Sequence, residues 1–393
     1  MPRAHRGWDH HLKSGTKLGP YLLHSSLGQG GFGITYRATD TEKNIEVAIK
    51  EYYPRSFVNR AADEHTVYAM PDDREAFTNG KGEFLGEANM LKMLNHRYIV
   101  SVIDAFTANG TVYMVMPFYE GSETLKDWLV RTRARVGDRD KPLLEFSSAY
   151  QRLRSIFKVL SYLHEKNIIH RDIKPSNILL VPREDKPRSR RVILIDFGGA
   201  RQFVAEKSGS YSRLLTPGYS PVEQYNKRAR LGAWTDVYAL AATLLTVILG
   251  RTPPEALDRL AAQQEGQDEI AWDRLENHIQ PIMQKALAVD YRNRYQSVKE
   301  FEDAIRKAIR SAPKILKPHP TDDPSETSAD VFQTNIDESA DRSDSSIDEP
   351  DEPILIVDPP EKPKRKHSVA WGIVLSIFIF LGATAMLMYL ISL

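Results

Sequence analysis

The chain has 393 residues, a formal net charge of +1, 41% hydrophobic residues and 27% charged residues. The near-neutral charge gives no indication of a nucleic-acid partner, and the absence of cysteine excludes disulfides and cysteine-ligated metal sites. The length allows a large domain together with additional segments. Residues 1–20 are expected to form a basic leader. Its first part, Met1 to His11, lacks the apolar run of a signal peptide and should be solvated.

Short alternating stretches follow, and they predict a β-rich N-terminal part. Strands are expected at Tyr21–Gly28, Gly33–Thr39, Ile45–Glu51, Val100–Phe106 and Val112–Met116, with one helix at about Glu83–Leu94. The turn Ala108-Asn109-Gly110 is typical of a hairpin between the last two strands. The polar residues 54–81 are expected to form an irregular insertion.

Beyond Gly121 the pattern becomes mostly helical. Helices are expected at Ser148–Lys166, Thr235–Leu249, His278–Ala288 and Ser297–Ile309. The second of these is apolar almost all round, which indicates a helix buried in a core. The basic residues 182–191 are expected to form the solvated tip of a hairpin, with a docking role as the alternative. The fold class is therefore α+β, with a small β-rich part followed by a larger helical part.

Gly28-Gln29-Gly30-Gly31-Phe32-Gly33 fits the pattern G-x-G-x-x-G, which by itself is weak because dinucleotide-binding folds share it. Here a strand-like run, Ile34–Arg37, follows the glycines, whereas a dinucleotide-binding loop would open a helix. In a glycine-rich hairpin, backbone N–H groups can approach triphosphate oxygens without obstruction from Cβ. Lys50 lies on the next strand, and Glu87 on the following helix could be its anionic partner. Taken singly, a solvated lysine and a solvated glutamate are the simpler interpretation.

His170-Arg171-Asp172-Ile173-Lys174-Pro175-Ser176-Asn177 is more specific. Asp172 can accept the proton of a hydroxyl, Lys174 can neutralise charge on a transferring phosphoryl group, and Asn177 can offer an oxygen ligand to magnesium. Asp196-Phe197-Gly198 follows a hydrophobic strand, so Asp196 would be a second metal-binding group at a strand end. For Asp196-Phe197-Gly198 alone, a simple turn is an equally good interpretation.

These motifs occur in a set order, each on its expected element, and together they resemble the eukaryotic-type (Hanks-type) serine/threonine protein kinase family over roughly Tyr21–Ile309. The strings G-Q-G-G-F-G-I-T-Y, V-A-I-K-E-Y-Y-P and T-P-G-Y-S-P-V-E-Q-Y are most similar to bacterial members. The resemblance implies a two-lobed kinase domain at 21–312, with the N-lobe at about 21–116 and the C-lobe at about 121–312. It implies ATP and Mg²⁺ as cofactors, with Mn²⁺ as an alternative, and protein Ser/Thr hydroxyls as acceptors.

The resemblance also assigns roles to single residues. The catalytic residues would be Asp172, Lys174, Lys50 and Glu87, and the metal ligands Asn177 and Asp196. The residues that would contact ATP are Leu27, Gly28, Gln29, Gly30, Gly31, Phe32, Gly33, Thr35, Ala48, Lys50, Met116, Pro117, Phe118, Tyr119, Glu123 and Leu179. Among these, Met116 matches the gatekeeper, Pro117-Phe118-Tyr119 match the hinge, and Glu123 matches a position that contacts ribose or a basic substrate residue. The structural residues would be the spine Leu91, Val102, His170 and Phe197, the loop anchor Asp236, and the ion pair of Glu223 with Arg294.

The activation segment, between Asp196 and Glu223, departs from the family pattern at Gly199, Leu215 and Pro221, which leaves its flexibility and the substrate fit open. Its hydroxyls are candidates for activating autophosphorylation, because a phosphate could pair with Arg171 and order the segment. The candidates are Ser208, Ser210, Ser212 and Thr216, with Ser210 or Ser212 favoured. Thr216 could instead contact Asp172 and Lys174, as in serine/threonine-type members. Solvated loop serines are the alternative.

The composition changes after Ala312. Residues 313–367 are rich in Pro, Ser, Asp and Glu, which predicts a disordered linker, and they end in a basic juxtamembrane cluster. Residues 369–391 carry no charge and are long enough to cross about 30 Å of hydrocarbon, which predicts a transmembrane helix rather than a buried core helix. The basic flank indicates a single-pass membrane protein whose kinase domain is cytoplasmic. Gly372 and Ser376 would permit helix pairing and thus a homodimer.

Two other functions remain open from the sequence. A pseudokinase would use the fold as a membrane-bound scaffold, but Lys50, Asp172 and Asp196 are all retained. A small-molecule kinase is disfavoured because Thr216-Pro217-Gly218-Tyr219-Ser220-Pro221-Val222-Glu223 resembles the platform that receives a peptide.

Overall fold

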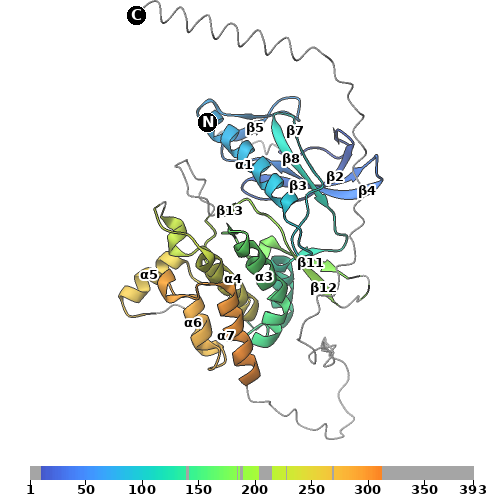
Figure 1. Cartoon of the computed structure of the whole chain (residues 1–393). Coiled ribbons are helices and arrows are strands. Elements are labelled where there is room, and N and C mark those ends of the chain that lie inside the picture. The colour runs from blue at the N-terminus through green and yellow to red at the C-terminus, as the bar shows by residue number, and fades with distance from the viewer. Residues whose placement is uncertain are drawn as a thin grey trace, which may run out of the picture. The chain divides into compact units, whose positions relative to one another are not determined.

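A computed structural model of the chain describes residues 10–138, 141–183, 185, 189–202, 215–226, 228–267 and 270–311. These residues belong to one compact unit that spans residues 1–316. Within this unit a β-rich lobe precedes a mainly helical lobe, as the fold class predicted (Figure 1). The expected linker and transmembrane helix lie outside the described residues.

The N-terminal lobe is built on a six-stranded antiparallel sheet in the order β1-β2-β3-β4-β8-β7. Its strands are β1 (Lys17–Leu18), β2 (Tyr21–Gln29), β3 (Gly33–Asp40), β4 (Ile45–Tyr52), β7 (Asp104–Ala108) and β8 (Thr111–Pro117). The first three predicted strands are confirmed almost to the residue, because alternation of buried and exposed side chains marks a strand with one face on a core. The turn at Asn109 and Gly110 has positive φ at both residues, as a tight hairpin requires.

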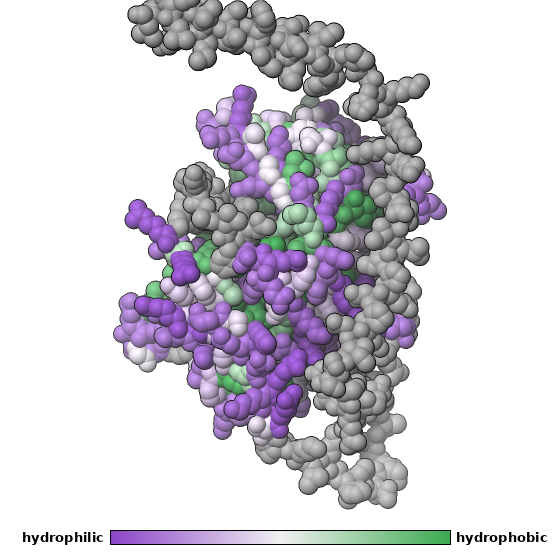
Figure 2. Space-filling view, in the orientation of Figure 1, coloured by the Kyte–Doolittle hydropathy of each residue, from purple (hydrophilic) through white to green (hydrophobic). Residues whose placement is uncertain are grey.

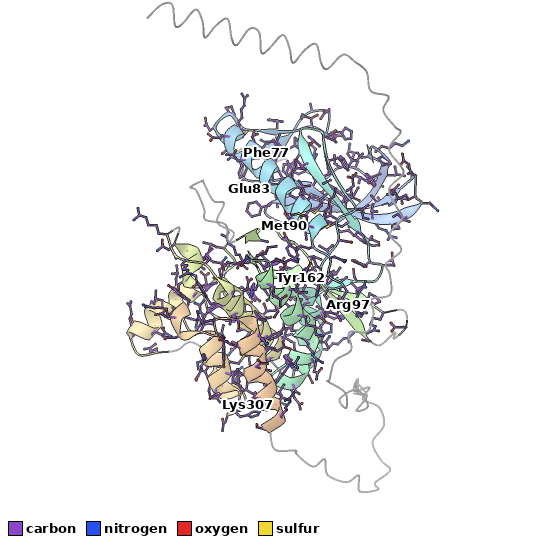
Figure 3. All side chains as sticks on the ribbon, viewed as in Figure 1. Phe77, Glu83, Met90, Arg97, Tyr162 and Lys307 are labelled. Carbon is purple, nitrogen blue, oxygen red and sulfur yellow. The ribbon has the colours of Figure 1, made fainter. Side chains whose placement is uncertain are left out.

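The insertion at residues 54–81 is ordered rather than irregular. It contains the hairpin β5 (Val58–Arg60) and β6 (Val67–Ala69), the short helix η1 (Pro71–Asp73) and the beginning of α1 (Arg74–Met93). The helix was predicted to begin at Glu83. It begins earlier because Phe77 (labelled in Figure 3) and Phe84 on α1 both pack on the ring of Tyr52, with centroids 5.7 and 5.6 Å away, and this burial supports the extra turns.

The expected leader is also shorter than predicted. Leu12 is buried in the core, and its backbone N–H donates to Tyr36 Oη at 3.1 Å. Lys17 and Leu18 form β1 and pair with β2. The reason is that Leu12 and Leu18 carry apolar surface that the sheet can bury, so residues 10–20 pack as part of the lobe.

The C-terminal lobe surrounds α4 (Ala233–Leu249), in which every residue from Thr235 to Leu249 is buried. The other helices are α2 (Leu125–Val136), α3 (Phe146–Glu165), α5 (Ala256–Gln264), α6 (Gln280–Ala286) and α7 (Val298–Ser311), with short helices η2 (Pro175–Asn177), η3 (Val222–Tyr225), η4 (Trp272–Arg274) and η5 (Tyr291–Asn293). The four predicted helices are confirmed. Helix α2 was not predicted, although Thr124 and Asp127 form a capping box that could have indicated it.

Two small sheets are formed by short strands that follow the N-terminal lobe in the chain. Strands β9 (Glu123–Thr124), β11 (Ile178–Pro182) and β12 (Arg190–Leu194) form one sheet, and β10 (Ile168–Ile169) pairs with β13 (Arg201–Gln202). The pairing of β11 with β12 confirms the hairpin expected around residues 182–191. On the face shown in Figure 2, several apolar side chains lie near the junction of the lobes. Over the described residues, no helix combines the length and hydropathy that a membrane span requires.

Candidate active site

Lys50 is held between two carboxylates. Its Nζ lies 2.9 Å from Asp196 Oδ1 and 3.6 Å from Glu87 Oε1, so β4, α1 and the loop after β12 meet at one point. Burial disfavours the ammonium charge, but Asp196 and Glu87 outweigh it and raise the pKa of Lys50 above its ordinary value. Burial acts against the charge of Asp196 too, yet Lys50 lowers the pKa of that carboxyl to about 2. The interpretation of Lys50 and Glu87 as solvated residues is therefore wrong.

Glu87 links α1 to the segment that carries Asp196. Its Oε1 accepts a hydrogen bond from the backbone N–H of Phe197 at 3.0 Å. Burial raises the pKa of Glu87, and the nearby Lys50 opposes this rise. Asp196 adopts φ +66°, a left-handed conformation that costs a residue with Cβ roughly 1–2 kcal/mol. The contacts to Lys50 and Gly198 hold Asp196 in that conformation.

Asp172 is the centre of a second polar cluster and is only 3% exposed. Its Oδ2 lies 2.8 Å from Lys174 Nζ and accepts from Asn177 Nδ2 at 2.8 Å, while its Oδ1 accepts from Thr216 Oγ1 at 2.7 Å. Lys174 Nζ also donates to Thr216 Oγ1 at 3.0 Å. These bonds fix both oxygens of a buried carboxylate, and they place Thr216 in contact with Asp172 and Lys174.

Asp236 at the start of α4 anchors the loop that carries Asp172. It is fully buried and accepts from the backbone N–H groups of His170 and Arg171 at 2.9 and 2.8 Å, and from His164 Nε2 at 2.8 Å. Burial alone would raise the pKa of Asp236, but the bond from His164 and the neighbouring donors leave it lowered. Arg171 is held at φ +70°, so the anchoring bonds stabilise a strained turn.

Packing and a buried ion pair support this site. The rings of His170 and Phe197 meet edge to face at 4.7 Å, and Leu91, another residue of the expected spine, is also buried. Arg294 binds Glu223 through both carboxylate oxygens at 2.6 and 3.0 Å, with both side chains almost completely buried. Such a pair positions η3 against the segment after η5 more than it adds net stability.

A further network, which the sequence analysis missed, lies behind Lys50. Glu51 is fully buried and accepts from the hydroxyls of Tyr36 and Tyr113 at 2.9 and 3.0 Å. Arg60 of the β5–β6 hairpin donates to both oxygens of Glu51 at 3.0 and 2.8 Å, and also to the backbone oxygen of His10. Alternation along β4 puts Glu51 on the face opposite Lys50, which was the available signal for a second buried charge.

Residues 21–313 match the protein kinase domain family. The chain belongs to the protein kinase family. It is 29% identical over 310 residues to serine/threonine-protein kinase PknA of Nostoc sp., covering 75% of this chain and 48% of that protein. It is also 29% identical over 302 residues to serine/threonine-protein kinase PknF of Mycobacterium tuberculosis, covering 75% of this chain and 57% of PknF. The chain thus spans about half the length of these relatives.

Solved structures share the kinase fold. The apo form of PpkA-294 has a TM-score of 0.61 and 28% sequence identity, covering 75% of this chain and 99% of that chain. The PknI kinase domain of Mycobacterium tuberculosis, as a C20A_R136A double mutant, has a TM-score of 0.55 at 19% identity, which is a likeness in fold alone.

The residues expected to contact ATP in this kinase domain are brought together by the sheet registers. Thr35 pairs with both Gly28 and Lys50, and Ala48 pairs with Met116. Gly33 allows a close approach, because a Cβ there would lie 2.4 Å from the backbone oxygen of Glu51. The hinge follows β8 directly, and Leu179 on β11 pairs with Thr124 on β9. Ser208, Ser210 and Ser212 lie outside the described residues.

Kinases of this family use ATP with a divalent cation, and the donors present fit one. Asn177 turns its Nδ2 toward Asp172, so its Oδ1 is the atom that could serve as a metal ligand. The side chain of Asp196 is 41% exposed. Both are hard oxygen donors of the kind that Mg²⁺ prefers, with phosphate oxygens and water completing its shell. Across the described parts of the chain, no group of three or more His, Asp or Glu residues forms an all-protein metal cage.

Proposed function

We propose that the chain is a serine/threonine protein kinase that transfers the γ-phosphate of ATP, with Mg²⁺, to hydroxyls of protein substrates. The observation that carries this proposal is the cluster around Asp172. A buried carboxylate is held there by Lys174, Asn177 and Thr216, in a domain that has also assembled the Lys50–Glu87 pair. A pseudokinase scaffold does not need this arrangement.

In the proposed reaction, Asp172 orients the acceptor hydroxyl and accepts its proton, because hydrogen bonds fix both of its carboxylate oxygens. Lys174 neutralises charge on the transferred phosphoryl group. Lys50, kept ionised by Glu87 and Asp196, holds the α- and β-phosphates. Asn177 and Asp196 would hold the metal, which would neutralise phosphate charge when bound. The hinge residues Pro117–Tyr119 bind adenine through their backbone.

The experiment incubates the full chain with labelled ATP, Mg²⁺ and a generic protein, next to Asp172→Asn as the matched control. We expect label on Ser and Thr of the protein, and a loss of about 100-fold or more in the variant with ATP binding retained, because a positioned base contributes that much. Label on a small molecule alone would favour the small-molecule alternative. ATP binding without any transfer would favour the pseudokinase.

We also propose that this kinase activates itself by phosphorylation at Ser208, Ser210 or Ser212. The support is chemical: a phosphate carries close to two negative charges, and Arg171 beside the catalytic base can pair with it. Thr216 is the weaker candidate, because its hydroxyl already bonds Asp172 and Lys174. Mass spectrometry of wild type and Asp172→Asn, expressed alike, tests this. Equal phosphate on both proteins, or none on the wild type, would exclude autoactivation at these serines.

A membrane anchor at residues 369–391 is the third part of the proposal, and its support is the uncharged sequence with a basic flank on the N-terminal side. The kinase domain would then be cytoplasmic. A chain that lacks residues 370–393 should remain in the supernatant and keep its activity, while the full chain sediments with washed membranes. If the truncated chain still sediments, the anchor is elsewhere.

Crosslinking of the full chain in membranes would test a homodimer.

A further inference from the structure

A groove of about 770 Å³ lies beside the catalytic loop. Lys126, Val130 and Arg133 line it from α2, and Arg251 lines it from the segment after α4. It reaches Lys174 and Thr216, and both of these residues contact Asp172. We call this hollow the α2 groove. Because Lys174 and Thr216 both touch the proposed base, residues that flank a hydroxyl bound at Asp172 come within reach of the groove.

The α2 groove carries uncompensated positive charge. Its basic residues are Lys126, Arg133, Lys174 and Arg251, of which Lys174 is paired with Asp172, and none of the described residues that line it is acidic. Arg133 donates to the backbone oxygens of Asp138, Lys141 and Leu249, which fix the guanidinium without neutralising its charge. Lys126 and Arg251 are exposed and, within the described parts of the chain, form no ion pair.

Acidic groups close in sequence to the α2 groove are already engaged. Asp138, which follows the lining residue Gly137, lies 3.8 Å from Lys141. Glu123 on β9 lies 2.8 Å from Arg131 and its side chain is 16% exposed. Asp127 on α2 accepts from the hydroxyl of Thr124 at 2.6 Å in the capping box. Glu123 was one residue that could have bound a basic substrate side chain, and its pairing with Arg131 makes it a poor partner for one.

We infer that the α2 groove binds acidic residues that flank the phosphoacceptor, so that this kinase prefers acid-rich peptides. This inference rests on the proposed function and names its substrate class. Lys126 provides an exposed ammonium from α2 and Arg251 an exposed guanidinium from the segment after α4, and Asp or Glu side chains can pair with both. A peptide with Lys or Arg at the same positions meets like charge and is disfavoured.

The test uses serine peptides of one length with Asp or Glu, Ala, or Lys or Arg on either side of the serine. Steady-state kcat/KM is measured with MgATP at about 50 mM salt. An exposed ion pair is worth about 1.5- to 5-fold, so two pairs should favour the acidic peptide over the alanine peptide by roughly 2- to 25-fold. The preference should shrink at about 300 mM salt, because salt screens exposed pairs.

Charge reversal locates the effect. In Lys126→Glu/Arg251→Glu the ratio of kcat/KM for acidic and neutral peptides should fall to one or below, and Lys126→Ala/Arg251→Ala provides a milder second variant if the first fails to fold. Lys307→Glu on α7 reverses one positive charge on another exposed surface and should keep the ratio (Figure 3). No acid preference in the wild type, or one that survives in both double variants, overturns the inference. Absence of transfer to any peptide or protein removes the proposed function itself.

Discussion

The network behind Lys50 makes a sharp prediction about stability. Arg60 is 6% exposed at its side chain and Glu51 is fully buried, and two hydrogen bonds join them. In Arg60→Met, Glu51 keeps only the hydroxyls of Tyr36 and Tyr113 as partners among the described residues. A buried charge without its counter-ion is strongly unfavourable, because the low-dielectric interior solvates it poorly.

We expect Arg60→Met to lower the free energy of unfolding by about 3–5 kcal/mol, the cost of breaking a buried ion pair from one side. At roughly 2 °C per kcal/mol for a domain of this size, the Tm should fall by about 6–10 °C. Part of the loss also reflects the bonds from Arg60 to the backbone oxygens of His10 and His65, which tie residues 10–12 and the β5–β6 hairpin to the sheet.

The assay is thermal unfolding of wild type and a double-mutant cycle with Glu51→Gln. Glu51→Gln alone should destabilise, because it leaves the Arg60 guanidinium unpaired. In the Arg60→Met background the same change should stabilise by about 1–3 kcal/mol, because it removes the unpaired buried charge. Arg292→Met is the control: Arg292 pairs with Asp290 while 76% exposed, so its loss should lower the Tm far less than Arg60→Met does. If Glu51→Gln destabilises in both backgrounds, the charge argument is wrong.

Three further outcomes follow from the site. Lys50→Met should lower the single-turnover rate by about 100-fold because it removes the phosphate-binding cation, and an unchanged rate would disprove that role. Thr216→Val should reduce kcat by about 10- to 100-fold through misplacement of Asp172, while Thr216→Ser should keep most of it; equal rates in the two variants would contradict a role for the hydroxyl. Burial lowers the pKa of His170, so below about pH 6.5 the unfolded chain binds a proton that the native chain does not. The free energy of unfolding therefore decreases as the pH is lowered. Thermal unfolding at pH 7.5 and 5.5 should show a smaller loss for His170→Phe than for wild type, and an equal loss would refute this contribution.

The chemistry of the site could be predicted from the sequence because the informative patterns are local. Strands such as Gly33–Asp40 and the buried helix Ala233–Leu249 show their periodicity within a few residues. The residues from His170 to Asn177 also carry their roles in one short stretch, since proton transfer, charge neutralisation and metal ligation each require a particular side chain. This motif, together with the kinase family that it resembles, therefore indicated the roles of Asp172 and Lys174.

Other features depend on contacts between segments that are far apart in the sequence. The packing of Leu12, the β5–β6 hairpin and the early start of α1 come from contacts with the sheet and with Tyr52, which no local pattern contains. The same holds for charge. The sequence offered Glu123 as a partner for a basic residue, and only the folded chain places Arg131 against it and brings Lys126 and Arg251 to one groove. The net charge of a site depends on which ionised groups lie within a few ångströms of one another, and tertiary structure decides those distances.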